Sequence, residues 1–197
     1  PAAIDESSAR LEVWLAAEVG DVSGDALKHL SKMRSAKVTL HELPTKADWD
    51  AALQDDDEGG GWIFVDGILG IGAKGPARGP AAGAITYINT FARRNLVVSI
   101  DVPSGLDADT GEAMGDAVHA DITATMGLPK MGLLAPGAIE HVGALEVVDI
   151  GLPPDLVNEV ESDIEMITPM DLRQVWNSRG GVPRLRLIKR RYQAAAS

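Results

Sequence analysis

The sequence predicts an α/β fold in which a mostly parallel sheet carries helices on both of its faces. Segments with the pattern of strands alternate along the chain with segments with the pattern of helices, which is typical of that architecture. The chain has 197 residues and is 45% hydrophobic, which is enough for one well-buried core. It contains no cysteine, which excludes a disulfide framework and thiolate-bound metal centres.

The first third of the chain contains three predicted strands and two predicted helices. Ser23 can cap a helix over residues 23–33, and Asp25 in its first turn is favoured by the helix dipole. Residues 37–43 alternate polar and apolar side chains, as a half-buried strand does. The other predicted elements here are strands over residues 11–16 and 62–65, a helix over 47–54 and an acidic, glycine-rich turn over 55–61.

The rest of the chain continues the alternation. A helix over residues 81–94 follows a glycine-rich loop over residues 67–80. Residues 96–100 are apolar except for Ser99 and predict the most convincing buried strand of the chain. Two more strands are predicted over residues 121–126 and 145–149, and the sequence Thr168-Pro169-Met170-Asp171 has the spacing of a helix start.

The net charge of -11 is unevenly distributed, because the stretch from Arg179 onward holds six basic and no acidic residues. We therefore expect one domain over residues 1–178 and a solvated basic tail over residues 179–197. The acidic domain makes nucleic acid an unfavourable partner. The sequence shows no signal-peptide pattern and no membrane-spanning apolar run, so we expect a cytoplasmic protein without a membrane partner.

Two predicted strands end in an aspartate, Asp66 and Asp101, and each opens into an unusual loop. In open α/β sheets, ligands bind beyond the carboxyl ends of the strands, so both carboxylates are candidates for a site. The alternative is that each aspartate caps the following turn by accepting backbone N–H bonds. After Asp101, Ser104 offers a hydroxyl group close to the carboxylate, and Asp107 and Asp109 are expected to be turn formers.

The loop after Asp66 has the composition of a phosphate-binding segment. Six glycines fall between Gly67 and Gly83, and glycine lets a backbone come close to a ligand and expose its N–H groups. Lys74 and Arg78 supply positive charge, and the following helix directs its N-terminus to the same region. The alternative is a flexible surface loop.

Residues 70–75 match the dinucleotide-binding pattern G-x-G-x-x-G, yet their context differs from it. That pattern follows the first strand of a βαβ unit and runs directly into a helix. Here it follows the third strand, and Pro76 and Pro80 delay the helix. A hydride-transferring dehydrogenase is therefore disfavoured.

Four motifs occur in order between about residue 62 and residue 154. They are V-D-G-I-L-G at 65–70 with K-G at 74–75, S-I-D-V-P-S-G-L-D at 99–107, G-L-P-K-M-G-L-L at 127–134 with P-G-A at 136–138, and V-V-D-I-G-L-P at 147–153. Together they resemble the YjeF N-terminal domain family, whose enzymes are NAD(P)H-hydrate epimerases. The resemblance implies a Rossmann-like three-layer α/β/α sandwich.

The resemblance implies an isomerase that acts on NADHX and NADPHX, the hydrated forms of NADH and NADPH. Water adds to the nicotinamide ring at a carbon next to the ring nitrogen, and these enzymes interconvert the R and S epimers for cofactor repair. Asp101 resembles the catalytic acid/base, which suits a reaction that moves a proton on or off an oxygen. The implied substrate-binding residues are Asp101 with Gly24, Asp25, Gly70, Ile71, Gly72, Ala73, Lys74, Gly75 and Pro76.

The same resemblance implies a cofactor and partners. Asp66 and Ser104 resemble ligands of a potassium ion, which oxygen atoms can hold. The implied functional partner is NAD(P)H-hydrate dehydratase, which accepts one epimer and restores the cofactor, and a homodimer is a further expectation. Residues 167–173 resemble the linker that leads into the dehydratase half of fused bacterial enzymes.

The loop at residues 20–26 departs from the family pattern, which is roughly Gly-Asn-Asn-Gly-Gly-Asp-Gly. Gly20, Gly24 and Asp25 match, whereas Asp21 and Val22 stand in place of the two asparagines. These changes are expected to weaken nucleotide binding, and the helices expected before the first strand are missing from the predicted domain. Two hypotheses follow: an epimerase impaired by a degenerate first loop, and a non-catalytic module for binding or dimerisation.

Overall fold

The computed structural model describes residues 10–36, 38–55 and 61–160. The predicted helix start at Thr168, the domain boundary at 178 and the basic tail over 179–197 lie outside these ranges, as does most of the acidic turn at 55–61. The chain divides into two compact units between Asp149 and Ile150. Among the described residues, no helix is long and apolar enough to cross a bilayer.

All the strands and helices predicted within these ranges are present, with small shifts of their bounds. In chain order the elements are β1 (Glu12–Leu15), α1 (Gly24–Ser35), β2 (Thr39–Glu42), α2 (Lys46–Asp55), β3 (Ile63–Asp66), α3 (Gly79–Phe91), β4 (Leu96–Ile100), β5 (Ile122–Met126), α4 (Ile139–Val142), β6 (Ala144–Val148) and α5 (Pro154–Asn158). Single 3-10 turns lie at Val19–Asp21, Ala92–Arg94, Met131–Leu134 and Pro136–Ala138. The short α4, α5 and 3-10 turns contain too few residues for a periodic apolar pattern to reveal them.

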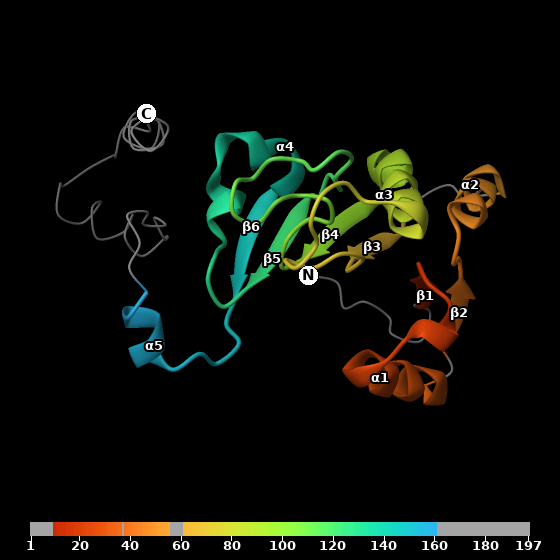
Figure 1. Ribbon diagram of the computed structural model, residues 1–197, viewed down its shortest axis with the longest axis horizontal. Helices are drawn as coiled ribbons and strands as arrows, with labels where there is room; N and C mark the ends of the chain where they lie inside the picture. The colour runs from red at the N-terminus through yellow and green to blue at the C-terminus, as the bar shows by residue number, and fades with distance from the viewer. Residues whose placement is uncertain (1–9, 37, 56–60, 161–197) are drawn as a thin grey trace. The chain divides into compact units, whose positions relative to one another are not determined.

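Every strand pairs in parallel, as predicted, but the strands form two sheets instead of one. β1 pairs with β2, while β3, β4, β5 and β6 lie side by side in chain order (Figure 1). Aromatic side chains link the smaller sheet to the helices α2 and α3. The Trp14 ring of β1 lies 5.9 Å from the Trp49 ring of α2 and 5.0 Å from the Tyr87 ring of α3, measured between centroids.

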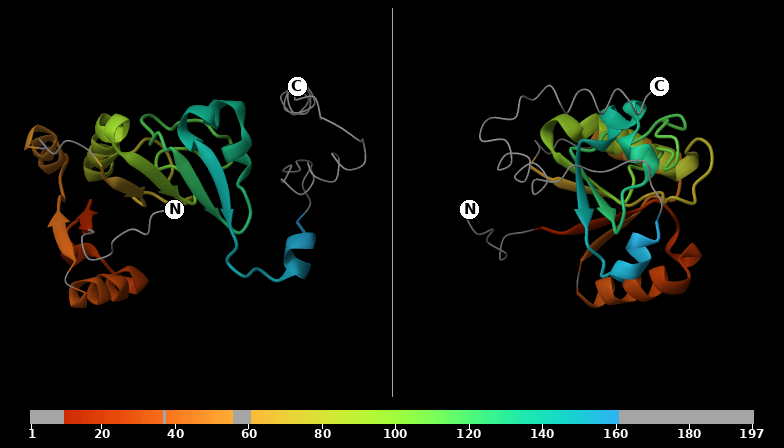
Figure 2. Two further views of the ribbon diagram at one scale, coloured as in Figure 1. Left: turned by 180° about the vertical axis from the view of Figure 1, so that it is seen from behind. Right: turned by 90° about the vertical axis from the view of Figure 1, so that its left-hand side faces the viewer.

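The helices α3 and α4 cover the same face of the four-stranded sheet (Figure 2). On α3, Ile85 is fully buried and belongs to one cluster with Val97 of β4 and Phe64 of β3. From β5, the Thr123 hydroxyl donates a 2.7 Å hydrogen bond to the Val142 carbonyl of α4. Because Phe64 is in register with Val97, and Ser99 of β4 with Thr123, these side chains share a face.

The opposite face of this sheet is also apolar. It presents the side chains of Ile63, Val65, Leu96, Ile100, Met126 and Val148, all of them exposed. Apolar residues on both faces are typical of parallel strands, and they explain why residues 96–100 are apolar at every position except Ser99.

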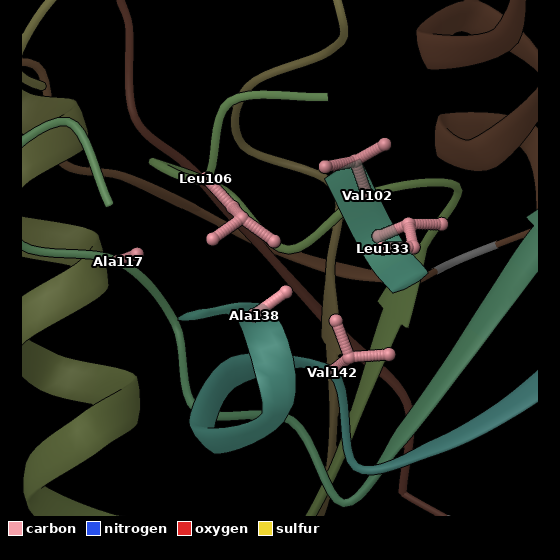
Figure 3. Packing of buried hydrophobic residues seen from close by; sticks show 6 residues of the cluster. All are labelled: Val102, Leu106, Ala117, Leu133, Ala138 and Val142. Atoms are coloured by element: carbon pink, nitrogen blue, oxygen red, sulfur yellow. The ribbon is translucent and has the colours of Figure 1, made fainter. Parts of the chain in front are cut away.

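The loop after β4 is fixed by its own apolar cluster. Val102, Leu106, Ala117, Leu133, Ala138 and Val142 are buried together and bring this loop against α4 (Figure 3). Gly105 in the loop has a φ of +92°, and a Cβ there would lie 2.3 Å from the Asp116 carbonyl oxygen. The backbone that follows Asp101 is therefore held in one conformation, which glycine at position 105 permits.

Candidate functional site

The Asp66 carboxylate, at the end of β3, is fully buried and accepts four hydrogen bonds. Oδ1 accepts from the Ser104 hydroxyl at 2.6 Å and the Ile68 amide at 3.3 Å. Oδ2 accepts from the Ser99 hydroxyl and the Ser104 amide, both at 2.8 Å. A carboxylate has about four acceptor positions, so all of them are in use. Asp66 therefore joins β3, β4 and the loop after β4, and only the bond from the Ile68 amide matches the turn-capping alternative.

Ser104 connects the two loops that follow β3 and β4. Its hydroxyl donates to Asp66 and accepts a 2.9 Å hydrogen bond from the Leu69 amide in the glycine-rich loop. Its side chain is almost fully buried, at 1% exposure. Ser104 therefore joins the β4 loop to the start of the glycine-rich loop.

These contacts bear on the predicted potassium ion. Asp66 and Ser104 carry the oxygens expected to hold it, and those of Asp66 are all engaged in internal hydrogen bonds. Both residues are also closed off from solvent, with 0% and 1% of their surface exposed. In this arrangement the pair does not fit a potassium ion, because binding would first require the carboxylate to give up its present donors.

Asp101 lies directly after β4 in a backbone conformation that is uncommon for residues other than glycine. Its φ is +68°, and it is the one non-glycine residue with positive φ in the described ranges. Such a conformation costs about 1–3 kcal/mol and persists where the surrounding structure imposes it. The Asp101 amide donates to the Ala124 carbonyl at 2.9 Å, so the residue still belongs to the β4–β5 ladder.

The Asp101 side chain accepts hydrogen bonds through only one of its two oxygens in the described part of the chain. Oδ1 accepts hydrogen bonds from the Met126 amide at 3.0 Å, from the Thr125 hydroxyl at 3.3 Å and from the Lys130 ammonium. Within residues 10–36, 38–55 and 61–160, no hydrogen bond reaches Oδ2. The side chain is 25% exposed, so one carboxylate oxygen is held while the other remains available to a ligand.

The surroundings of Asp101 favour its charged form. Burial acts to raise its pKa, but the hydrogen bond from Lys130, the Met126 amide and the charge of Lys130 together hold the pKa below its ordinary value of 3.8. Lys130 is the one charged side chain that contacts Asp101 in the described part of the chain. Asp101 is consequently a carboxylate near neutral pH.

The glycine-rich loop leaves most of its backbone exposed to solvent. Gly70, Gly72 and Lys74 are exposed, and the Ala73 amide closes a turn on the Gly70 carbonyl at 3.0 Å. A Cβ added at Gly70 or Gly72 would meet no atom within 4 Å. The fold itself therefore does not require glycine at these two positions, whereas a ligand that approached the backbone closely would.

The first loop, at residues 20–26, differs from the glycine-rich loop in its contacts. Gly24 begins α1 with a φ of +60°, and Asp25 forms an ion pair with Lys28 of the same helix, with Asp25 Oδ1 and Lys28 Nζ 2.7 Å apart. No hydrogen bond or ion pair joins Asp25 to the loops after β3 and β4 among the described residues. The structure thus unites Asp66, Ser104 and the start of the glycine-rich loop, and it leaves the roles predicted for Gly24 and Asp25 as predictions.

Sequence reasoning missed Lys130 and Thr125. Lys130 follows β5 within the G-L-P-K motif, and its ammonium contacts Asp101, the Thr125 hydroxyl at 3.3 Å and the Met126 carbonyl at 3.2 Å. A usable signal existed, because parallel neighbours β4 and β5 end at the same edge of the sheet. A lysine shortly after β5 was thus a candidate partner for an aspartate directly after β4.

Comparison with known proteins places this site in a family. The family described as "YjeF-related protein N-terminus" matches residues 3–132 of the chain, which include both aspartates, the glycine-rich loop and Lys130. The chain belongs to this family. The expected membership is therefore confirmed.

Relatives within the family carry informative names. A "Bifunctional NAD(P)H-hydrate repair enzyme Nnr" of Salinibacter ruber is 35% identical over 182 residues, which are 87% of this chain and 33% of that protein. An "NAD(P)H-hydrate epimerase" of Levilactobacillus brevis is 46% identical over 90 residues, 46% of this chain and 41% of that protein. The chain thus spans less than half the length of either relative.

A solved structure confirms the fold class. The crystal structure of yeast ynu0 superposes with a TM-score of 0.55 at 19% identity, over 76% of this chain and 59% of that one. The match shows a shared α/β fold built on parallel strands.

Proposed function

We propose that this chain is an NAD(P)H-hydrate epimerase, an isomerase that interconverts the R and S epimers of NADHX and NADPHX. The observation that carries the proposal is Asp101: a strained, ionised carboxylate at the carboxyl end of a central strand, with one oxygen held and one available. One relative named NAD(P)H-hydrate epimerase and one named for NAD(P)H-hydrate repair support it.

Asp101 suits the chemistry of that substrate. The carbon that carries the added hydroxyl group is a hemiaminal centre, which loses its configuration when the hydroxyl departs or when the ring opens. Either route moves a proton on or off an oxygen. The available Oδ2 of Asp101 can accept or return that proton when the hydroxyl lies within hydrogen-bond distance.

The glycine-rich loop suits the phosphates of a dinucleotide. Residues 70–76 expose backbone next to Lys74 and Arg78, both of which are exposed. The helix α3 begins at Gly79 with no acidic residue in its first turn, so its positive end meets no competing carboxylate there. We assign this loop to the phosphates and Asp101 to the nicotinamide ring.

The proposal includes the partners expected from the family. An epimerase of this kind supplies a dehydratase that accepts only one epimer, and the word "bifunctional" in the names of the longer relatives supports such a pairing. A homodimer stays a prediction. No step of the proposed reaction passes through a potassium ion.

The proposal is tested by following the two epimers of NADHX chromatographically after one of them is enriched. Their approach to equilibrium should be faster with the purified chain than in buffer alone. A folded protein that leaves the rate unchanged would contradict the proposal. The alternative of a non-catalytic binding module would then be preferred, and equilibrium binding of NADH would test it.

A further inference from the structure

Three hydrogen bonds determine what the Lys130 ammonium can do. An ammonium group has three N–H donors, and Lys130 directs them at Asp101 Oδ1, the Thr125 hydroxyl and the Met126 carbonyl. Its side chain is only 21% exposed. With every donor engaged, Lys130 has no proton to offer a substrate directly.

The same contacts determine how Asp101 is presented. Thr125 and Met126 belong to β5, and they fix Oδ1 from the neighbouring strand at 3.3 Å and 3.0 Å. Lys130 adds a charge-assisted bond to the same oxygen. Three donors on one oxygen orient the whole carboxylate plane, because Oδ1 and Oδ2 are rigidly connected.

We propose that Lys130 is a positioning residue for the epimerisation, which holds Asp101 as an oriented carboxylate so that Oδ2 acts first as a base and opens the nicotinamide ring. This inference rests on the proposed function and selects one of its two chemical routes. Departure of the hydroxyl group would need an acid at the outset. Neither member of the pair is an available acid: Asp101 is ionised, and the protons of Lys130 are engaged.

The proposed step conserves atoms and charge. Asp101 Oδ2 takes the proton from the substrate hydroxyl, the electrons of that O–H bond form a carbonyl group, and the bond between carbon and ring nitrogen breaks. The nitrogen keeps the electron pair of that bond and receives the proton back from Asp101. Rotation of the open-chain aldehyde exposes its other face, and the reverse steps close the ring to the other epimer. The substrate oxygen never leaves its carbon.

Oxygen isotopes distinguish the two routes. Epimerisation in water enriched in ¹⁸O, followed by mass spectrometry during the initial rate, should show far less than one ¹⁸O incorporated for each epimerisation event. One ¹⁸O for each event would overturn the inference while leaving the epimerase intact, since it would mean that the hydroxyl departs. Absence of any catalysis by the folded protein would instead remove the proposed function, and the inference with it.

The role of Lys130 has its own test. The pH dependence of kcat distinguishes a loss of Asp101 positioning from a general loss of protein stability. Lys130→Met should lower kcat by about 10–100-fold through misplacement of Asp101. It should also move the acidic limb of the profile to higher pH, because the Asp101 pKa rises when the charge and hydrogen bond of Lys130 are lost. Lys130→Arg, which keeps the charge, should restore the position of that limb. Lys46→Met removes an exposed lysine that pairs with Asp50 at 2.7 Å on α2, and should change neither quantity. An unmoved acidic limb in a folded Lys130→Met protein would overturn the role of Lys130.

Discussion

Ser104 donates both its hydroxyl and its backbone amide to the Asp66 carboxylate, at 2.6 Å and 2.8 Å. Both residues are buried, and the two come from loops that follow different strands. These two hydrogen bonds connect the glycine-rich loop to the loop that carries Asp101. The candidate site is therefore assembled around a buried polar contact.

Loss of this contact should destabilise the protein. Asp66→Asn should lower the free energy of unfolding by about 2–4 kcal/mol, because an amide nitrogen would face donors that now meet a carboxylate oxygen. Ser104→Ala should cost about 1–3 kcal/mol, since the Asp66 carboxylate loses a donor and the Leu69 amide loses its acceptor. Urea denaturation followed by circular dichroism measures both values.

Asp50→Asn is a suitable control for Asp66→Asn, because Asp50 is an exposed member of an ion pair on α2. Its effect should stay within about 0.5 kcal/mol. Equal effects of the two substitutions would show that the buried hydrogen bonds of Asp66 stabilise the fold no more than an exposed ion pair does.

Potassium provides a separate test. A gain in wild-type stability specific to potassium over sodium would contradict the conclusion that Asp66 and Ser104 do not fit the ion.

Substitution by alanine should lower the stability of the protein at one glycine near the site and leave it unchanged at another. Gly105→Ala should lower stability by about 2–4 kcal/mol, because its φ is unfavourable for alanine and the new Cβ overlaps the Asp116 carbonyl. Gly72→Ala, where the new Cβ meets nothing, should leave stability within about 0.5 kcal/mol. If residues 70–76 hold the phosphates, Gly72→Ala should raise KM for NADHX with kcat unchanged. Unchanged kinetics would count against that assignment.

The ion pair of Asp101 and Lys130 should make stability depend on pH in the acid range. The folded protein holds the Asp101 pKa below 3.8, so the pair stabilises the folded state above that pH. This contribution is lost as pH falls below 3.8 toward the folded-state pKa. The stability difference between wild type and Lys130→Met should thus be constant near neutrality and shrink on acidification. A difference that stays constant down to the acid transition would contradict this.

Much of the fold follows from the sequence because its signals are local. Residues 96–100, apolar except for Ser99, are bounded by Asn95 and Asp101, and the strand β4 has the same bounds. The glycine-rich loop between β3 and α3 was equally predictable from its glycines and prolines. By contrast, the division of the strands into two sheets depends on which strand edges meet, which no local pattern encodes.

The candidate site was only partly predictable for the same reason. Both strand-end aspartates could be located, but their different roles depend on distant partners. Ser99 and Ser104 lie 33 and 38 residues from Asp66 and convert it into a buried structural group. Lys130 lies 29 residues from Asp101 and lowers its pKa. Chain order alone does not indicate which carboxylate will receive the hydroxyl donors and which the ammonium.

The most direct test of the account compares wild type with Asp101→Asn in the assay of NADHX epimers. Asparagine preserves the shape of the side chain and can still accept from the Met126 amide, but it is not a base. Asp101→Asn should therefore lower kcat by about 10²–10⁴-fold while the protein remains folded. A folded Asp101→Asn protein that equilibrates the epimers as fast as wild type would contradict the central claim that Asp101 performs the proton transfer.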